Sequence, residues 1–408
     1  MDQATCHTGN EATLRFIAAH REEDVRALAL QSQRDGDVDL PWALEQIQGW
    51  QTARRKLPSW AARDGIVYPP HLSMEQCSSE QTALYKCSVM EQLAEACRET
   101  LVDLTGGFGV DFAFLAPLAK RATYVERQAH LCEAARHNFA LLGLEHAQVI
   151  NAEAEAMLEQ MAMTASPAST LLYLDPARRD SHNGRTHAIA DCTPDVLELK
   201  DALFRVADHI LIKLSPMLDW HKAVSDLGGR VSQVHIVGTG GECKELLMLL
   251  SADHEGEPEV CCVNDGQRFT YRPSENDGRV AIAADVIGAS YLYEPNSTLM
   301  KAGCFAVLTQ RFPVSAVAND SHLFLSDQAI DDFPGRRFAV AAVTTMNKKE
   351  LGRALKDTTR ANVTVRNFPI SAQALRQRLH MQDGGDTYIF GTTAANGLKV
   401  LFICRKLS

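Results

Sequence analysis

Apolar residues recur in two different patterns along the chain, and the change between them divides it into regions. Up to about residue 70 they have helical spacing, as in ATLRFIAAH and PWALEQIQGW, without the alternation typical of strands. The Pro-rich stretch GIVYPPHL at 65–72 breaks this pattern, and a further helix is predicted from about residue 76, in SSEQTALYKCSVMEQLAEAC. The sequence therefore predicts a helical N-terminal region over residues 1–70.

From residue 71 to about 275, short apolar runs of strand length alternate with segments of helical spacing. The predicted strands are LVDL (101–104), ATYVE (122–126), AQVI (147–150), TLLYLD (170–175), HILIKL (209–214) and VSQVHIVG (231–238). Helical segments such as AHLCEAARHNFALL (129–142) separate them. Buried strands joined by helices indicate an α/β fold with a doubly wound, mostly parallel sheet. EVCCVNDGQRFTYR (259–272) predicts a hairpin that turns at Asp265-Gly266.

The alternation stops after about residue 275, and the remaining chain predicts small α+β domains. YLYEPNSTLMKAGCF (291–305) lies in a first segment, for which we expect the bounds 276–330. FPGRRFAVAAV (333–343) opens a C-terminal domain, for which we expect the bounds 331–408. The end of the chain predicts a second hairpin, which turns at Asn396-Gly397.

The composition predicts an ordinary globular protein. With 408 residues, of which 46 % are hydrophobic and 23 % charged, the chain is long enough for two or three domains with buried cores. The N-terminal stretch lacks the features of a signal peptide, and no apolar run approaches the roughly 20 residues that span a bilayer. None of the 11 cysteines stands in a CxxC pair with metal-ligand spacing. We therefore expect a cytoplasmic protein with reduced thiols, no metal and no membrane contact.

Positive charge gathers near the C-terminal end. Residues 336–380 contain ten Lys and Arg residues against Glu350 and Asp357, which gives this segment a local charge of +8. The net charge of the chain is −10, so the rest carries −18. A basic segment on an acidic body fits the docking of a polyanion such as RNA at one place, although a run of charges also forms an ordinary solvated surface.

A glycine-rich loop, VDLTGGFGVD (102–111), follows the first predicted strand and opens a helix. Its glycines let backbone N–H groups approach a ligand, and the helix N-terminus adds partial positive charge. Such a loop suits a dinucleotide or S-adenosylmethionine (SAM). The GxGxxG pattern of dinucleotide sites is incomplete here, because Phe112 takes the place of the third glycine. Asp103 would repel a pyrophosphate but can accept a hydrogen bond from the methionine amine of SAM, so the loop favours SAM.

Acidic residues at the ends of the next two strands complete a predicted cofactor site. Glu126 lies 23 residues after Asp103, where a carboxylate can accept both hydroxyls of an adenosine ribose. Glu153 follows the third strand and can reach the adenine amino group, or serve only as a first-turn acid of a helix. Asp111 fits a helix start better than a ligand. The cofactor contacts that we predict are Asp103, Thr105, Gly106, Gly107, Gly109, Asp111, Glu126, Arg127, Glu153 and Asp175.

The stretch LDPARRD (174–180) follows the fourth strand and predicts the acceptor side of the site. Ligands of such sheets lie beyond the carboxyl ends of the strands, so this loop borders the transferred methyl group. Methyl transfer from a sulfonium is helped mainly by alignment and by steadying the nucleophile. Asp175 can hold or deprotonate an acceptor, and Arg178 or Arg179 can clamp a phosphate. Lys213, in IKLSPMLD after the fifth strand, is expected on the same rim, so the predicted catalytic residues are Asp175, Arg178 and Lys213.

The sequence resembles, along nearly its whole length, a family of bacterial class I SAM-dependent methyltransferases with a C-terminal THUMP-like domain. The resemblance is carried by LSMEQCSSEQTALYK (72–86), VDLTGGFGVD, LDPARRD, IKLSPMLD, ECKELL (242–247), YLYEPNSTLMKAG, FPGRRF, VRNFPISAQALRQRL and DGGDTYIFGTT. It implies a Rossmann-like methyltransferase core over 71–275, a small ferredoxin-like domain over 276–330 and a THUMP-like domain over 331–408. THUMP domains bind RNA, so the resemblance also implies an RNA substrate, tRNA or rRNA.

The core is also similar to the cap and tRNA guanine-N2 methyltransferases, whose fourth motif is (D/N)PP followed by an aromatic residue. Here the corresponding residues are Asp175-Pro176-Ala177-Arg178, without the second proline and the stacking aromatic, which leaves the methylated atom open. Our interpretation is a SAM-dependent methyltransferase that acts on structured RNA. Three alternatives remain at this stage: a methyltransferase of a small molecule or protein, a non-catalytic RNA-binding protein with a vestigial SAM site, and an NAD-dependent oxidoreductase, which Phe112 and Asp103 disfavour.

Overall fold

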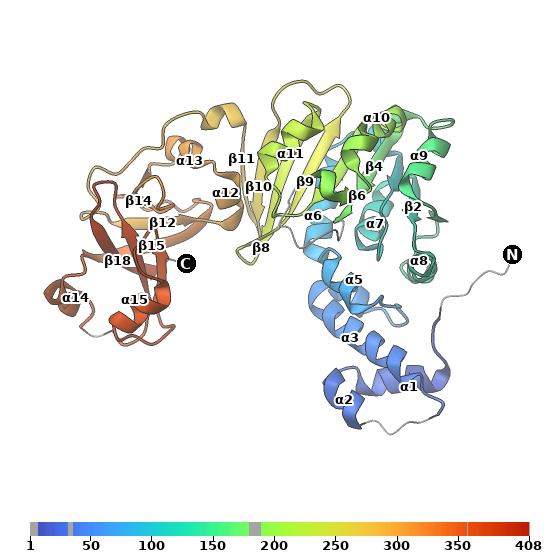
Figure 1. Ribbon diagram of the computed structural model, residues 1–408, viewed down its shortest axis with the longest axis horizontal. Helices are drawn as coiled ribbons and strands as arrows, with labels where there is room; N and C mark the ends of the chain where they lie inside the picture. Colours follow the sequence, from blue (N-terminus) through green and yellow to red (C-terminus); the bar gives the residue numbers. More distant parts are fainter. Residues whose placement is uncertain (1–6, 32–35, 179–188, 357, 408) are drawn as a thin grey trace. The chain divides into compact units, whose positions relative to one another are not determined.

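The structure is a computed structural model that describes residues 7–31, 36–178, 189–356 and 358–407. The chain divides into two compact units, which are coloured along the sequence in Figure 1. The first comprises residues 1–232 and 247–256, and the second comprises residues 233–246 and 257–408. The division passes through two neighbouring strands, β8 (Val231–Thr239) and β9 (Glu242–Ser251).

The described part of the N-terminal region is helical, as predicted, and contains no strand before residue 100. Polar side chains begin three of its helices: Asn10, Asp39 and Ser79 each accept a hydrogen bond from a first-turn backbone N–H. The helices of this region are α1 (Glu11–His20), α2 (Val25–Gln31), α3 (Leu40–Lys56), α4 (Pro58–Ala61), α5 (His71–Gln76) and α6 (Glu80–Glu91).

A buried apolar cluster joins these helices to the glycine loop. Trp60 packs edge-on against Phe108 of the loop, with ring centroids 5.0 Å apart. Asn138 anchors the connecting segment, because its side-chain amide exchanges two hydrogen bonds of 2.9 Å with the backbone of Val67. The cluster consists of Ala53, Leu57, Trp60, Ile66, Tyr68, Met74, Ala83, Phe108 and Val110. The N-terminal helices therefore support the loop that the sequence assigns to cofactor binding.

The first unit contains the predicted parallel sheet. Its strands run in the order β7-β4-β1-β2-β3, and all neighbours in this order are parallel. All five positions of β4 are buried, which explains the uninterrupted apolar run of TLLYL. The strands are β1 (Thr100–Asp103), β2 (Arg121–Glu126), β3 (Ala147–Asn151), β4 (Thr170–Leu174) and β7 (His209–Leu214). The predicted strand positions are confirmed to within a residue at each end.

Helices and short elements connect these strands. The connecting helices are α7 (Val110–Leu115), α8 (Ala129–Leu141), α9 (Ala154–Met161), α10 (Val196–Val206) and α11 (Trp220–Leu227). Two-residue strands β5 (Ala177–Arg178) and β6 (Cys192–Thr193) pair with each other beyond β4. The single-turn 3₁₀ segments are Glu95–Arg98, Ala116–Leu118, Pro167–Ser169, Ile189–Asp191 and Pro273–Asn276.

Strand β9 is a long strand of this sheet that the sequence did not predict. Its run KELLMLL carries apolar residues without alternation, and such a run fits a buried helix as well as a buried strand. In contrast, the hairpin predicted at Asp265-Gly266 is confirmed: β10 (Glu259–Asn264) pairs antiparallel with β11 (Gln267–Tyr271), and Asn264 lies opposite Gln267. Asp265 has the positive φ of 50° that such a tight turn needs.

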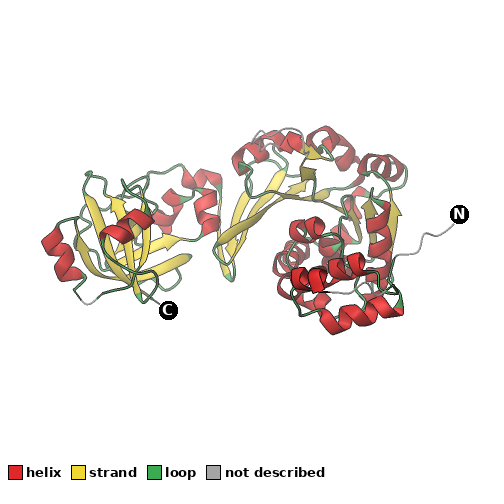
Figure 2. Ribbon diagram, turned by 60° about the horizontal axis from the view of Figure 1, so that its bottom comes forward, coloured by secondary structure: helices red, strands yellow, loops and turns green. Residues whose placement is uncertain are grey.

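The second unit also contains a seven-stranded sheet in the order β13-β14-β12-β15-β18-β17-β16, drawn in yellow in Figure 2. Its strands are β12 (Tyr291–Pro295), β13 (Ser315–Ala316), β14 (Phe324–Ser326), β15 (Gly335–Thr344), β16 (Asn362–Arg366), β17 (Thr387–Thr393) and β18 (Lys399–Lys406). Its helices are α12 (Ser297–Ala302), α13 (Phe305–Arg311), α14 (Lys348–Ala354) and α15 (Ala372–Arg378). The predicted C-terminal hairpin is confirmed, with Gly397 at φ 83° in the turn between β17 and β18.

The two predicted C-terminal segments share this one sheet. β12, from the segment 276–330, pairs along its whole length with β15, from the segment 331–408. Aromatic and branched side chains from both segments meet in a common core around Leu292, Phe338 and Phe402. The two segments therefore share one sheet and one core. The predicted domain boundaries at residues 70, 275 and 330 stay a prediction.

Candidate functional site

The carboxyl ends of four neighbouring parallel strands place charged side chains at one edge of the first unit's sheet. Asp103 is the last residue of β1, Glu126 the last of β2, and Asp175 follows β4 directly. Lys213 is the next-to-last residue of β7. In the register of the sheet, Asp103 lies beside Tyr173 of β4. The predicted site residues of these strands are thus brought to one edge, where sheets of this type bind ligands.

The glycine loop between β1 and α7 turns tightly over this edge. A Cβ on Gly106 would lie 2.1 Å from the ring of Tyr124, and a Cβ on Gly109 would lie 2.8 Å from Phe139. Gly107 and Gly109 have φ angles of +54° and +84°, in the left-handed region that favours glycine. Tyr124 donates its hydroxyl proton to the carbonyl of Gly107. Glycine is therefore required by space at Gly106, by backbone conformation at Gly107, and by both at Gly109.

Glu126 connects the end of β2 to the glycine loop. It is buried, and one carboxylate oxygen accepts the N–H of Gly107 at 2.9 Å while the other accepts the N–H of Gln128 at 2.8 Å. Asn151, at the end of β3, donates to the carbonyls of Glu126 and Arg127. These bonds fix the carboxylate at the rim of the loop, and each oxygen keeps a further lone pair for a ligand hydroxyl.

Asp103 lies at the bottom of the site with 2 % of its surface exposed. Its carboxylate accepts the backbone N–H of Thr105 at 2.9 Å. Burial raises the pKa of Asp103 well above the usual value, and the nearby carboxylates of Asp111, Asp175 and Glu126 raise it further. A site with this concentration of carboxylates disfavours a pyrophosphate and favours a ligand that carries positive charge.

The loops after β1 and β4 are joined by a hydrogen bond. The hydroxyl oxygen of Thr105 accepts the backbone N–H of Asp175 at 2.6 Å. The carboxylate of Asp175 forms an ion pair with the ammonium of Lys213, at a distance of 2.6 Å. The side chain of Asp175 is 37 % exposed, whereas that of Lys213 is 12 % exposed. The more deeply buried Lys213 therefore orients the carboxylate of Asp175 through this ion pair, and Asp175 remains accessible to an acceptor.

Beneath this pair lies a buried charge network around Asp111. Its carboxylate contacts the ammonium of Lys86 at 3.1 Å and accepts hydrogen bonds from Tyr173 at 2.7 Å and Ser78 at 2.8 Å. Lys213 lies 3.9 Å away. Burial alone would raise the pKa of Asp111, but the two lysines and the two hydroxyl donors lower it to about 2. These partners already occupy the carboxylate of Asp111. Its predicted contact with a cofactor stays a prediction.

Lys86 is a residue of this network that the sequence analysis missed. Its side chain has no exposed surface, and it comes from α6 of the N-terminal helices. Its ammonium also donates to the hydroxyl of Ser78 at 3.0 Å. The sequence signal that could have revealed it is the three-residue spacing of Lys86 from Ala83 and Val89, which places the lysine on the apolar, buried face of α6. Lysine is almost never fully buried without an anionic partner, so such a position points to a buried carboxylate.

Three further predicted residues lie at or beyond the rim. Arg127 and Glu153 are exposed, and Glu153 occupies the N-cap position of α9 without bonding to the helix backbone. Arg178 belongs to β5, but its side chain lies outside the described residues, as does the whole of Arg179. The roles predicted for these residues stay predictions.

A solved structure of a relative decides the family. A provisionally assigned methyltransferase from Porphyromonas gingivalis W83 is 32 % identical to this chain, and the match covers 97 % of this chain and 98 % of the other, with a TM-score of 0.84. The chain belongs to this methyltransferase family. The predicted enzyme class and the Rossmann-like fold are thereby confirmed, and with them the predicted cofactor of this class of methyltransferases, SAM.

Two family matches divide the C-terminal part of this methyltransferase. Residues 291–334 match a ferredoxin-like domain, and residues 335–406 match a THUMP domain-like family, which confirms the predicted resemblance. No protein of curated function matches the chain.

Other solved structures align with less than half of the chain. A SAM-dependent methyltransferase from Agrobacterium tumefaciens is 14 % identical, with 42 % of this chain and 61 % of the other covered and a TM-score of 0.31. An rRNA methylase from Streptococcus thermophilus is 16 % identical, with 42 % and 93 % covered and a TM-score of 0.30. Likeness at this level decides nothing about this methyltransferase.

The structure divides the basic segment 336–380 into paired and unpaired cations. Arg336 and Arg366 both contact the buried carboxylate of Glu294. Arg337 pairs with Asp331, and Arg376 pairs with Asp383. Within the described residues, the exposed cations without an ion pair in this segment are Lys348, Lys349, Arg353, Lys356, Arg360 and Arg378, of which the first three lie on α14. Much of the local charge therefore stabilises the fold, and the charge that remains for a ligand is concentrated on and directly after α14.

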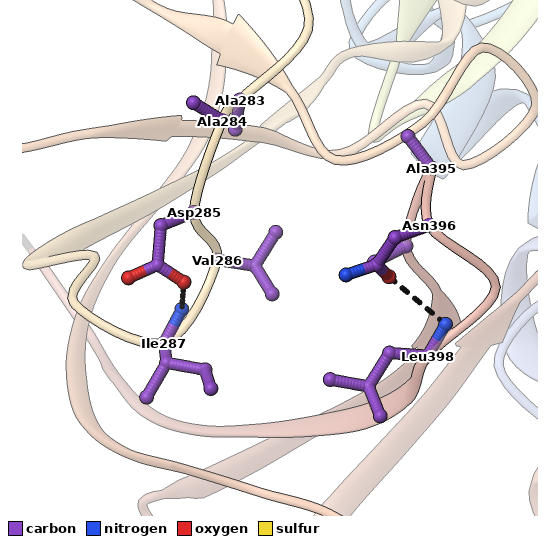
Figure 3. Close-up of a pocket in the computed structure, with 9 residues that line it drawn as sticks. Ala283, Ala284, Asp285, Val286, Ile287, Ala395, Asn396 and Leu398 are labelled. Atoms are coloured by element: carbon purple, nitrogen blue, oxygen red, sulfur yellow. Dashed lines mark hydrogen bonds between the residues drawn. The ribbon is translucent and has the colours of Figure 1, made fainter.

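A hollow in the second unit offers no comparable chemistry. It has a volume of about 170 Å³ and lies between residues 283–287 and the turn after β17 (Figure 3). Its two polar side chains are used locally: Asp285 accepts the N–H of Ile287, and Asn396 accepts the N–H of Leu398. In the described part of the chain, no three His, Cys, Asp or Glu residues are arranged to hold a metal, and no helix is long and apolar enough to cross a membrane.

Proposed function

We propose that this methyltransferase transfers the methyl group of SAM to a structured RNA, tRNA or rRNA, in the cytoplasm. The observation that carries the choice of RNA is the group of exposed cations on α14 that form no ion pair within the described residues, inside the domain that matches the THUMP domain-like family. Two turns of that helix carry Lys348, Lys349 and Arg353, and Lys356 lies just after its end. Cations without carboxylate partners at this spacing suit the phosphates of a nucleic acid backbone.

The group of acidic side chains at the carboxyl edge supports the assignment of individual residues to SAM. When bound, SAM supplies an electrophilic methyl group on a positively charged sulfur. In our proposal Asp103 accepts a hydrogen bond from the ammonium of the cofactor, and Glu126 accepts the ribose hydroxyls from its fixed position at the loop. The backbone of Thr105, Gly106, Gly107 and Gly109 forms the wall against which the cofactor lies, with Arg127 and Glu153 at its outer end.

The pair of Asp175 and Lys213 is our candidate for the acceptor side. The 2.6 Å contact keeps the carboxylate of Asp175 in one orientation, and its exposure leaves it within reach of an acceptor group. Asp175 would orient that group toward the methyl and take part in removing its proton. We assign to Arg178 the contact with a phosphate of the acceptor, as predicted from the sequence.

The experiment that tests the proposed function is mass spectrometry of nucleosides from total RNA. A strain without this gene should lack one methylated nucleoside of its parent, and the wild-type gene should restore it. A gene that encodes Asp175→Ala should not restore it although the protein accumulates normally. Identical nucleoside profiles in the deletion strain and its parent would contradict RNA methylation and favour a small molecule or a protein as the acceptor.

A further inference from the structure

A second concentration of positive charge lies on the first unit, away from the methyl-transfer site. A hollow of about 330 Å³ is lined by Lys200, Asp201, Phe204, Arg205 and Arg230. Three of the four charged side chains are cations, so the lining has a charge of +2 in a protein of net charge −10. The sequence analysis did not single out these residues.

The fold brings these side chains together from two elements. Lys200, Phe204 and Arg205 belong to α10, where Lys200 and Phe204 are four residues apart and share a face. Arg230 immediately precedes β8, and its guanidinium lies over the ring of Phe204, 4.7 Å from the centroid. This cation–π contact holds the guanidinium at the wall of the hollow. Its N–H bonds lie in the plane of the guanidinium, so stacking on the ring leaves them able to donate hydrogen bonds.

The three cations have no acidic partner in the part of the chain that the structure describes. Among the described residues, Lys200, Arg205 and Arg230 form no ion pair within 4.0 Å, and even Asp201, four residues before Arg205, forms none. The neighbouring helix α11 behaves differently, because its Lys222 is paired with Asp226 at 2.8 Å. Three cations converge on one hollow, and Asp201, the one carboxylate in its lining, forms no ion pair with them, so they are available to an external anion.

The position of the hollow restricts what that anion can be. Helix α10 ends at Val206 and leads into β7 at His209, so its C-terminal half lies toward the amino end of β7. Lys213 and its partner Asp175 lie at the carboxyl end of the same strand. A strand of six residues is about 20 Å long, at roughly 3.3 Å per residue. A single acceptor that contacts both places must therefore be a polymer that extends along the sheet.

We propose that the hollow of Lys200, Phe204, Arg205 and Arg230 binds phosphates of the RNA acceptor, at a distance from the methylated nucleotide. This inference rests on the proposed function, and it adds that the acceptor is an extended or folded RNA of several nucleotides. Arginine and lysine supply charge-assisted hydrogen bonds to phosphate oxygens, and contacts at this distance add affinity without taking part in the chemistry. The hollow is a second RNA contact, independent of the cations on α14.

The test compares two variants with the same change in charge. The site variant is Lys200→Glu, Arg205→Glu and Arg230→Glu, and the control variant is Arg15→Glu, Arg26→Glu and Arg63→Glu, which changes three exposed arginines of the N-terminal region. The substrate is total RNA of the deletion strain. In methyl transfer from labelled SAM, the site variant should have a KM roughly tenfold or more above that of the control, with kcat within about twofold.

Binding of the same RNA on filters, across a salt series, separates the possible outcomes. The slope of log K against log[salt] should become less steep by roughly 2 in the site variant, at about 0.7–0.9 per lost phosphate contact. A milder variant with Gln at the same three positions should change in the same direction, which controls for misfolding. Equal KM and equal RNA binding in the site and control variants would overturn the proposed contact. If wild-type protein binds RNA through the hollow but methylates none of it, the phosphate contact stands and the proposed function fails.

Discussion

Glu126 is held at the rim of the glycine loop because its two carboxylate oxygens accept backbone N–H groups, one from Gly107 and one from Gln128. If the same oxygens receive ribose hydroxyls, Glu126→Gln should weaken SAM binding by roughly 1–3 kcal/mol, the usual cost of losing a charged hydrogen-bond partner. Isothermal titration calorimetry measures this change. The control is Glu159→Gln on the exposed face of α9, which should bind SAM like the wild type. Equal affinities for both variants would contradict the role of Glu126.

Asp103 predicts an unusual dependence of stability on pH. An aspartate in an unfolded chain has a pKa near 3.9, and burial raises the pKa of Asp103 well above its usual value in the folded protein. Between these two values the folded protein holds a proton that the unfolded chain has released, so this residue makes stability fall as the pH rises through the window.

Asp103→Asn removes this contribution and keeps an acceptor for the N–H of Thr105. Over the same pH window, the Tm of the ligand-free variant should therefore fall less, or rise more, than that of the wild type. At a pH above this window the variant should bind SAM more weakly, because it lacks the charge that faces the ammonium. Parallel curves of Tm against pH for the two proteins would contradict the raised pKa of Asp103.

At the scale of elements, helix α6 is part of the site because it supplies Lys86 to Asp111. Lys86→Met should destabilise the protein by roughly 3–5 kcal/mol, since it leaves a buried carboxylate with one ammonium fewer. The double variant with Asp111→Asn should be more stable than the single variant. Denaturant unfolding measures both. Lys120→Met, which removes an exposed pair with Glu99, is the control and should change stability little. A loss in Lys86→Met no larger than in the control would contradict the network.

Helix α14 is the element to which we assign the main RNA contact. Lys348→Glu, Lys349→Glu and Arg353→Glu should lower RNA affinity and flatten its salt dependence, for which a slope near −3 is expected if about four cations neutralise phosphates. SAM affinity should not change, since the predicted cofactor residues lie in the other compact unit. The Arg15, Arg26 and Arg63 variant described above serves as the charge-matched control. RNA affinity equal to that of this control would show that α14 is only a solvated face.

At the scale of the whole molecule, local patterns predicted the parallel sheet, the two hairpins and the glycine loop, because each depends on residues close together in the sequence. Contacts between distant residues were not predictable in this way. Lys86 forms an ion pair with Asp111, which lies 25 positions away in the sequence, and Arg366 forms one with Glu294, which lies 72 positions away. A count of charges over 336–380 could not separate paired arginines from the free cations of α14. Strand β9 was missed because its apolar run fits helix and strand alike.

An RNA methyltransferase must pass the methyl group of SAM to RNA. The most direct measurement incubates purified wild-type protein with SAM labelled in its methyl group and total RNA from the deletion strain, and counts label in the RNA. We expect label in RNA with the wild type, none above background with Asp175→Ala, and none when RNA of the parent strain, already methylated, replaces that of the deletion strain. Absence of label with the wild type, in a protein that binds SAM, would contradict RNA as the acceptor.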